Sequence, residues 1–213
     1  MKDLTELVFI LDRSGSMSGL EKDTIGGFNS LIEKQKREKG DAIVTTILFN
    51  NTSKVLYNRV DLKDVKPLTE NDYVVYGGTA LVDAVGIAIS QINRIHMSMK
   101  KEEVPEKTLF VITTDGEENS SSHYTYREVF HMIQNQKFDH NWEFLFLGAT
   151  IDIVEEAEKI GIGKENAVAY NNDSVGTALN YDVLNETISD IRKNKKLSKN
   201  WKKKIEEDYE NRK

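Results

Sequence analysis

Hydrophobic and polar positions along the chain fall into two kinds of block that follow each other repeatedly. In the short blocks apolar residues fill consecutive positions, which is typical of strands buried on both faces of a sheet. In the longer blocks apolar residues recur every three or four positions, which is typical of helices that cover a sheet. The strands predicted from this pattern span residues 5–12, 42–49, 107–114, 142–147 and 167–170, and a further strand over residues 53–60 is predicted from the turn at Asn50 and Asn51. The predicted helices span residues 19–39, 80–97, 125–136, 152–161 and 174–193.

The order of these elements predicts the fold class. Strand and helix alternate except where Asn50 and Asn51 turn residues 42–49 back into residues 53–60, which predicts one antiparallel hairpin. Alternating strands and helices favour a mostly parallel sheet with helices on both faces. We therefore expect an α/β fold: a three-layer α/β/α, doubly wound arrangement around a six-stranded sheet with one antiparallel edge strand.

Composition fits one compact domain followed by a tail. The chain has 213 residues, of which 38% are hydrophobic, enough for a single substantial core. We expect the domain over residues 1–193 and a charged C-terminal tail over 194–213, helical or partly disordered. Basic side chains dominate residues 192–204 and acidic ones follow. Such a charge run is typical of a solvated helix, and a docking tail for an acidic partner is the alternative.

Composition also narrows the function classes. The chain has no cysteine, which excludes disulfides, thiolate metal sites and cysteine nucleophiles. Its apolar N-terminal run is too short for a signal peptide and no run approaches a membrane span, so we expect a cytoplasmic protein without a membrane partner. A net charge of −6 argues against nucleic acid as a partner.

Candidate chemistry begins where the first strand ends, at Asp12-Arg13-Ser14-Gly15-Ser16. Residues at alternate positions of an extended segment point the same way, and glycine lets the backbone curl around a small object. Asp12, Ser14 and Ser16 can therefore share one ligand, and their oxygens suit a hard divalent cation such as Mg²⁺. The alternative is turn chemistry alone, with a capping box from Ser18 to Glu21 opening the next helix.

Two later loops favour the shared site. Gly77-Gly78-Thr79 places a hydroxyl just before the helix predicted at 80–97. Asp115, within Thr113-Thr114-Asp115-Gly116-Glu117, places a carboxylate just after the strand predicted at 107–114. All of these segments fall on loops that open helices.

This three-part pattern resembles the metal-ion-dependent adhesion site of von Willebrand factor type A (vWA) domains, written Asp-x-Ser-x-Ser, then Thr, then Asp. The resemblance covers about residues 5 to 190 and points to a bacterial or phage member. It implies a site for Mg²⁺ or Mn²⁺ at Asp12, Ser14, Ser16, Thr79 and Asp115. It also implies the strand order 3-2-1-4-5-6, which sets the first and fourth strands side by side at the crevice where such folds bind ligands.

The function implied by the resemblance is metal-dependent protein binding of the adaptor or adhesion type. In the family, a Glu or Asp of a partner protein completes the coordination of the metal. A change in coordination also moves the final helix, here 174–193. Its predicted sliding stripe consists of Val175, Leu179, Leu184, Ile188 and Ile191. A static helix that merely covers the core is the alternative.

Several charged neighbours of the motif have simpler predicted roles. Arg13 is expected to pair with Asp115, Glu117 or another loop carboxylate, and a direct contact with the partner is the alternative. Glu117 and Glu118 are expected to be solvated loop residues, with tuning of metal affinity as the alternative. His123 is expected to be a surface residue of the third loop.

An enzyme is the main rival function. A Mg²⁺-dependent phosphohydrolase of the haloacid dehalogenase type would also start from an Asp at a strand end, here Asp12. Such enzymes use a second Asp two residues later as general acid, and Ser14 stands there. No Gly-x-Ser-x-Gly elbow and no phosphate-binding loop with a Lys-Ser/Thr pair is present. We therefore predict a protein that is not an enzyme.

Overall fold

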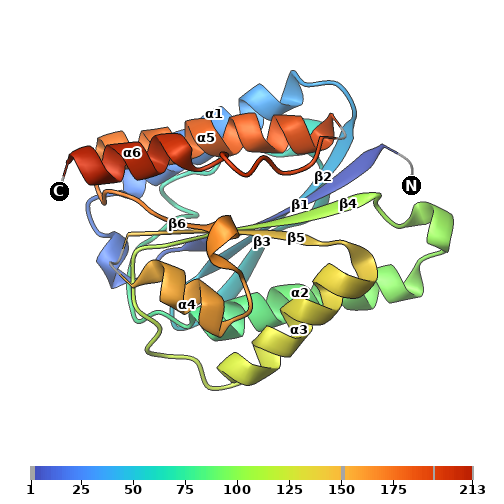
Figure 1. Ribbon diagram of the computed structural model, residues 1–213, viewed down its shortest axis with the longest axis horizontal. Coiled ribbons are helices and arrows are strands. Elements are labelled where there is room, and N and C mark those ends of the chain that lie inside the picture. The colour runs from blue at the N-terminus through green and yellow to red at the C-terminus, as the bar shows by residue number, and fades with distance from the viewer. Residues whose placement is uncertain (1–2, 150–151, 194, 213) are drawn as a thin grey trace.

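A twisted six-stranded sheet forms the centre of the molecule (Figure 1). The computed structural model describes residues 3–149, 152–193 and 195–212. The strands are β1 (Leu4–Asp12), β2 (Asp41–Phe49), β3 (Ser53–Asp61), β4 (Lys107–Thr114), β5 (Glu143–Gly148) and β6 (Ala167–Ala169). Their order is β3-β2-β1-β4-β5-β6, with β3 antiparallel to β2 and every other pair parallel. The predicted fold class and strand order are both confirmed.

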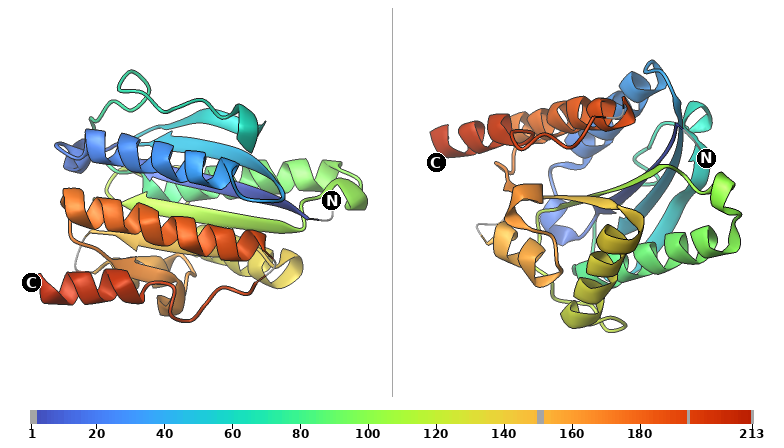
Figure 2. Two further views of the ribbon diagram at one scale, coloured as in Figure 1. Left: turned by 90° about the horizontal axis from the view of Figure 1, so that it is seen from above. Right: turned by 45° about the vertical axis from the view of Figure 1, so that its right-hand side comes forward.

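Helices cover both faces of this sheet. They are α1 (Glu21–Lys36), α2 (Leu81–Ser98), α3 (Tyr126–His140), α4 (Ile153–Lys159), α5 (Ser174–Arg192) and α6 (Lys203–Asn211). Helices α1, α5 and α6 lie on one face, and α2, α3 and α4 lie on the other (Figures 1 and 2). None of the helices within the described ranges is long and apolar enough to cross a membrane.

The two faces of β1 explain its unbroken apolar sequence. Leu7, Phe9 and Leu11 pack into the apolar layer under α1 and α5. Val8 and Ile10 pack into the opposite layer, under α2 and α3. Because helices cover both faces of this central strand, the whole of β1 is buried, and its sequence does not alternate between apolar and polar residues.

Several helix ends differ from the prediction, and α1 ends at Lys36 instead of residue 39. Helix α3 begins with the expected capping box of Thr125 and Glu128, but it continues to His140 instead of residue 136. It stops where Asn141 takes up a left-handed conformation with φ 54° and its N–H bonds to the carbonyl of Gln136. The capping box from Ser18 to Glu21, which belonged to the alternative of turn chemistry alone, is absent, since α1 begins after Leu20 without a side-chain cap.

The buried side of α5 also differs from the predicted stripe. Leu184, Ile188 and Ile191 are buried as expected, but Val175 is 61% exposed. In the first half of the helix the buried positions are Gly176, Thr177, Asn180 and Tyr181. The predicted apolar stripe that begins at Val175 is therefore wrong for the first half of α5. Small and polar residues occupy the side of the helix that faces the sheet there.

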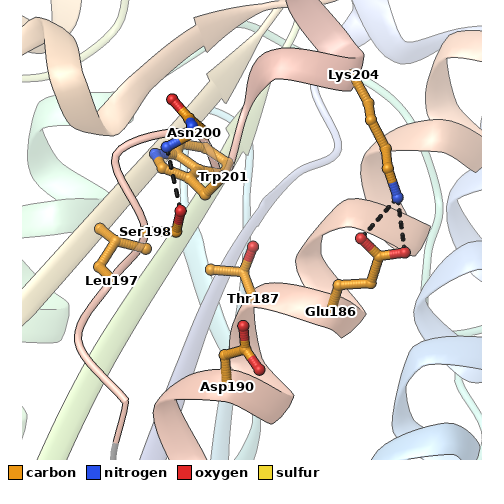
Figure 3. Close-up of a pocket in the computed structure, with 8 residues that line it drawn as sticks. All are labelled: Glu186, Thr187, Asp190, Leu197, Ser198, Asn200, Trp201 and Lys204. Carbon is orange, nitrogen blue, oxygen red and sulfur yellow. Dashed lines mark hydrogen bonds and ion pairs between the residues drawn. The ribbon is translucent and has the colours of Figure 1, made fainter.

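The charged C-terminal segment is helical and packs on the domain. Trp201 and Ile205 are buried in the same apolar layer as α1 and α5. Lys204 donates to both carboxylate oxygens of Glu186 on α5, each at 2.8 Å (Figure 3). A cavity of about 180 Å³ lies between α5 and this segment, lined by the residues drawn in Figure 3 and by none of the predicted metal-site residues. The predicted domain boundary at residue 193 remains a prediction.

Candidate metal site

Parallel pairing brings the first and third loops of the motif together. Strands β1 and β4 pair with Leu11 opposite Thr113, so Asp12 and Thr114 end neighbouring strands at the same edge of the sheet. The second loop is fastened to the first by backbone bonds. Gly15 N–H donates to Gly77 O at 2.9 Å, and Tyr76 N–H donates to the carbonyl of Arg13 at 3.1 Å.

A continuous run of hydrogen bonds links the side chains at this edge. Thr114 Oγ1 donates to Asp12 Oδ2 at 2.6 Å, and Ser14 N–H donates to Asp12 Oδ1 at 2.7 Å. The hydroxyls of Ser14 and Ser16 are hydrogen bonded at 2.9 Å. Ser16 Oγ then donates to Asp115 Oδ1 at 2.6 Å. The carboxylates of the first and third loops are thus joined through the two serines.

Three hydroxyl oxygens converge on the space left by the missing side chain of Gly116. A Cβ atom built on Gly116 would lie 2.6 Å from the Thr79 hydroxyl oxygen. It would lie 2.9 Å from that of Ser16 and 3.4 Å from that of Ser14. A side chain in this place would fill the space between the hydroxyls, and glycine leaves it free for a small ligand.

The two carboxylates of the site are buried without a compensating charge. Asp12 is 1% exposed and Asp115 is 7% exposed, and neither forms an ion pair with any described residue. Burial raises the pKa of Asp12 to about 6. The hydrogen bonds from Thr114 and Ser14 act in the opposite direction, because they favour the charged form. Burial also raises the pKa of Asp115, against its hydrogen bonds with Ser16 and Asn172. A cation between these groups would offset the cost of burying negative charge.

Two supporting residues have no signal in the sequence. Asn172, in the loop between β6 and α5, donates through Nδ2 to Asp115 Oδ2 at 3.1 Å. Asn119 accepts the backbone N–H of Thr79 at 2.9 Å. A third supporting residue, Thr114, was predicted only as the end of a strand. Its hydroxyl, next to Asp115 and directly after an apolar run, could have indicated its role in the site. Asparagine is common in loops, so only the fold identifies the roles of the other two.

Glu118 is a structural residue of the third loop and does not behave as a solvated one. Its carboxylate accepts hydrogen bonds from the backbone N–H groups of Val82, Ser120 and Ser121 at 2.8–3.0 Å. The Val82 N–H lies in the first turn of α2, where a negative charge is favourable. Glu117 is exposed, as predicted.

The predicted ion pair of Arg13 is wrong. No carboxylate among the described residues pairs with it, and its guanidinium carbon lies 5.4 Å from the centre of the Tyr76 ring. Side chains alternate along an extended strand end, so Arg13 points away from the serines. Its backbone is bonded to Tyr76, which places the side chain beside that ring.

The donor set of the site consists of hydroxyl and carboxylate oxygens. Across the ranges that the structure describes, no three His, Cys, Asp or Glu side chains gather as metal ligands. The site could therefore not be found by looking for clustered charged ligands. Oxygen donors of this kind suit hard cations such as Mg²⁺ and Mn²⁺ better than soft metals.

Comparison with solved structures places the fold among vWA-like domains. A matrix protein of the mussel byssus, solved with zinc in its metal-ion-dependent adhesion site, has a TM-score of 0.57 at 12% identity over 87% of this chain. A von Willebrand factor type A protein from Catenulispora acidiphila has a TM-score of 0.56 at 15% identity over 86% of this chain. The manganese-loaded TRAP protein of Plasmodium vivax has a TM-score of 0.55 at 15% identity over 83%.

These similarities concern the fold and only part of the related proteins. The chain spans 46% of the mussel protein, 42% of the Catenulispora protein and 72% of TRAP. No protein-family model and no curated protein matches the sequence. The chain therefore has a vWA-like fold.

Proposed function

We propose that this chain is a protein-binding domain that holds Mg²⁺ or Mn²⁺ and captures a carboxylate of a partner protein. The proposed metal-site residues are Asp12, Ser14, Ser16, Thr79 and Asp115. The observation that carries the proposal is the convergence of three hydroxyl oxygens on the space at Gly116.

The residues divide into two groups by what their oxygens already contact. The three hydroxyls would supply neutral donors. Both carboxylate oxygens of Asp12 and of Asp115 accept hydrogen bonds from the protein, so these groups hold the hydroxyl-bearing loops in place and face the cation directly or through water. When bound, a divalent cation with mostly neutral ligands supplies an electrophilic coordination position for an incoming carboxylate.

The solved structures support a divalent cation and leave its identity open. Zinc occupies the adhesion site of the mussel protein, and TRAP was solved with manganese. We prefer Mg²⁺ or Mn²⁺ for this chain because every donor is an oxygen and none is a histidine or a thiolate. A cytoplasmic location is part of the proposal and rests on the sequence alone.

A non-enzymatic role fits the site better than phosphate hydrolysis. The second acidic residue that a phosphohydrolase would need is replaced by Ser14, whose hydroxyl is engaged with Ser16. The similar structures include a matrix protein of the mussel byssus and a minor pilin of Streptococcus sanguinis. These comparisons favour binding over catalysis.

Isothermal titration with MgCl₂ and MnCl₂ tests the metal site. We expect one site in the wild type and at least about tenfold weaker binding in Asp115→Ala, because a removed supporting carboxylate loosens the hydroxyl ligands. Asp139→Ala removes an exposed carboxylate of α3 and serves as the control. Equal affinity in the wild type and Asp115→Ala would contradict the assignment.

A second pair of measurements separates binding from catalysis. Purified protein with Mg²⁺ should not hydrolyse p-nitrophenyl phosphate, while EDTA should abolish capture of a partner from lysate, with Asp12→Ala as the control. Hydrolysis that disappears in Asp12→Asn would replace this proposal with the phosphohydrolase.

A further inference from the structure

A buried arginine beside the proposed metal site lacks a counter-ion. Arg13 stands between Asp12 and Ser14 and is 7% exposed. Its Nε atom is buried without a hydrogen-bond partner, and no carboxylate among the described residues forms an ion pair with it. The guanidinium instead lies beside the ring of Tyr76, whose centre is 5.4 Å from the guanidinium carbon.

This environment is unfavourable for a guanidinium without an anion. A buried charge costs several kcal/mol unless it is paired, and stacking on an aromatic face offsets only part of that cost. By contrast, Arg192 is also buried, yet it donates to the oxygens of Gln35 and to the carbonyl of Gly40. The Nε atoms of both arginines are buried without a partner, but the terminal nitrogens of Arg192 are held by oxygens of the chain, whereas the Arg13 guanidinium lies against the Tyr76 side chain.

Tyr76 is an exposed neighbour of the buried Arg13. The Tyr76 side chain is 51% exposed although it belongs to a segment fastened to the metal loops on both sides. Its N–H bonds to Arg13 O, and its own carbonyl accepts Asn50 Nδ2 at 3.0 Å. The exposed ring and the guanidinium beside it are thus carried by the segments that form the first and second metal loops.

Charge is distributed unevenly around the site. On the side of β5 and α4, a cavity of about 270 Å³ shares Gly116 with the metal site. Its charged lining consists of Glu117, Glu118, Asp152, Glu156 and a single cation, Lys159. On the side of β2, the backbone N–H of Arg13 donates to Phe49 O, and the Arg13 guanidinium lies beside the Tyr76 ring. A second acidic group of a partner would be repelled on the first side and attracted on the second.

We propose that Arg13 is a second anion anchor beside the metal, so that the preferred partner segment presents two acidic side chains. One carboxylate would bind the metal and the other would accept hydrogen bonds from the Arg13 guanidinium at the edge of Tyr76. This inference rests on the proposed metal-dependent function and specifies the chemistry of its partner. Charge-assisted bonds to guanidinium are strong enough to discriminate between partners.

Capped glycine peptides test the anchor by NMR titration of the ¹⁵N-labelled protein with Mg²⁺. One peptide carries a single Glu, and the others carry two Glu separated by zero to three Gly. We expect at least one peptide with two Glu to bind the wild type about tenfold more tightly than the peptide with one. Its addition should also shift the Nε–Hε signal of Arg13, which the single-Glu peptide should leave in place.

Variants of matched charge identify the source of the preference. Arg13→Gln should bind the single-Glu peptide as the wild type does and lose the preference for two Glu. Lys54→Gln is the control, because it removes an exposed positive charge that also acts on the Tyr76 phenol. This variant should keep the preference for peptides with two Glu. If Arg13→Gln fails to fold, the Arg13 signal of the wild type decides alone.

Each failure has its own meaning. Binding of the single-Glu peptide with no preference for two Glu, or a preference that survives in Arg13→Gln, overturns the anchor and leaves the metal-dependent function intact. Absence of Mg²⁺-dependent binding of every peptide overturns both.

Discussion

At the scale of single residues, the absence of a side chain at Gly116 is as important as any ligand. The space that it leaves is bounded by hydroxyls from the first and second loops. We predict that Gly116→Ala abolishes Mg²⁺ binding in calorimetry, because the new methyl group would lie 2.6 Å from Thr79 Oγ1 and push the hydroxyls apart.

The control for this substitution is another glycine. Gly26 lies on the exposed side of α1, and no atom lies within 4 Å of the position that an alanine methyl group would take there. Gly26→Ala should raise the free energy of unfolding by about 0.5–1 kcal/mol and leave metal binding unchanged. Normal metal affinity in Gly116→Ala would show that the hydroxyls do not define the site.

Asn172 carries a second prediction at this scale. Its amide holds the Asp115 oxygen that Ser16 does not contact. Asn172→Ala should weaken Mg²⁺ binding about 10-fold to 100-fold, as is usual when a group that orients a metal ligand is removed. Asn171→Ala is the matched control, since the neighbouring amide bonds to Asp208 of α6 instead. Equal losses in the two variants would indicate a general effect of the loop.

At the scale of elements, Asp83 of α2 anchors the end of the third loop. Asp83 accepts the backbone N–H groups of Ser122, His123 and Tyr124 at 2.8–2.9 Å. The His123 ring is exposed, as predicted, and its Nδ1 lies 3.1 Å from Asp83. Burial opposes the charged form of Asp83, but these hydrogen bonds outweigh it and lower the pKa of the carboxyl below its ordinary value of 3.8.

This anchor predicts a pH-dependent stability difference. Because the pKa of Asp83 is lower in the folded than in the unfolded chain, its contribution is present above the ordinary pKa and is lost as pH falls through the folded value. Urea denaturation should show Asp83→Asn to be less stable by about 2 kcal/mol at pH 7. The difference should shrink below about pH 4. A difference that stays constant from pH 7 to pH 3, or an equal loss in Asp139→Asn, would contradict this role.

Elements were predictable from the sequence wherever one physical signal dominated. Strands β1 and β4 are buried on both faces, so each contains an unbroken apolar run, and the end of that run locates the motif residues that follow it. The end of α3 was missed because its last turn is largely exposed, Phe138 included, and does not continue the buried side of the helix. The contact of Arg13 was predicted wrongly and the role of Asn172 was missed. The neighbours of both residues come from distant segments of the chain, which a local sequence pattern does not contain.

At the scale of the whole molecule, the proposed cation would join three loops that are far apart in the sequence. One follows β1, one follows β4, and one lies just before α2. A ligand that binds only the folded state stabilises it by about 2.7 kcal/mol at one hundred times its dissociation constant. For a domain of this size the melting temperature should then rise by about 5–10 °C in differential scanning calorimetry. Asp115→Ala should show no such rise, and KCl of equal ionic strength should not replace MgCl₂. An equal rise in Asp115→Ala would place the stabilising ion elsewhere.

The central position of β1 has a consequence for synthesis of the chain. Among the strands of this sheet it is the first to be synthesised, and β2, with which it pairs, follows soon afterwards. Its other neighbour, β4, follows only after a hairpin and a long helix have been made. Pairings between distant segments form slowly and leave apolar surface uncovered in the meantime. The earliest part of the proposed site to be synthesised must therefore wait, with one edge unpaired, until more than half of the chain has emerged.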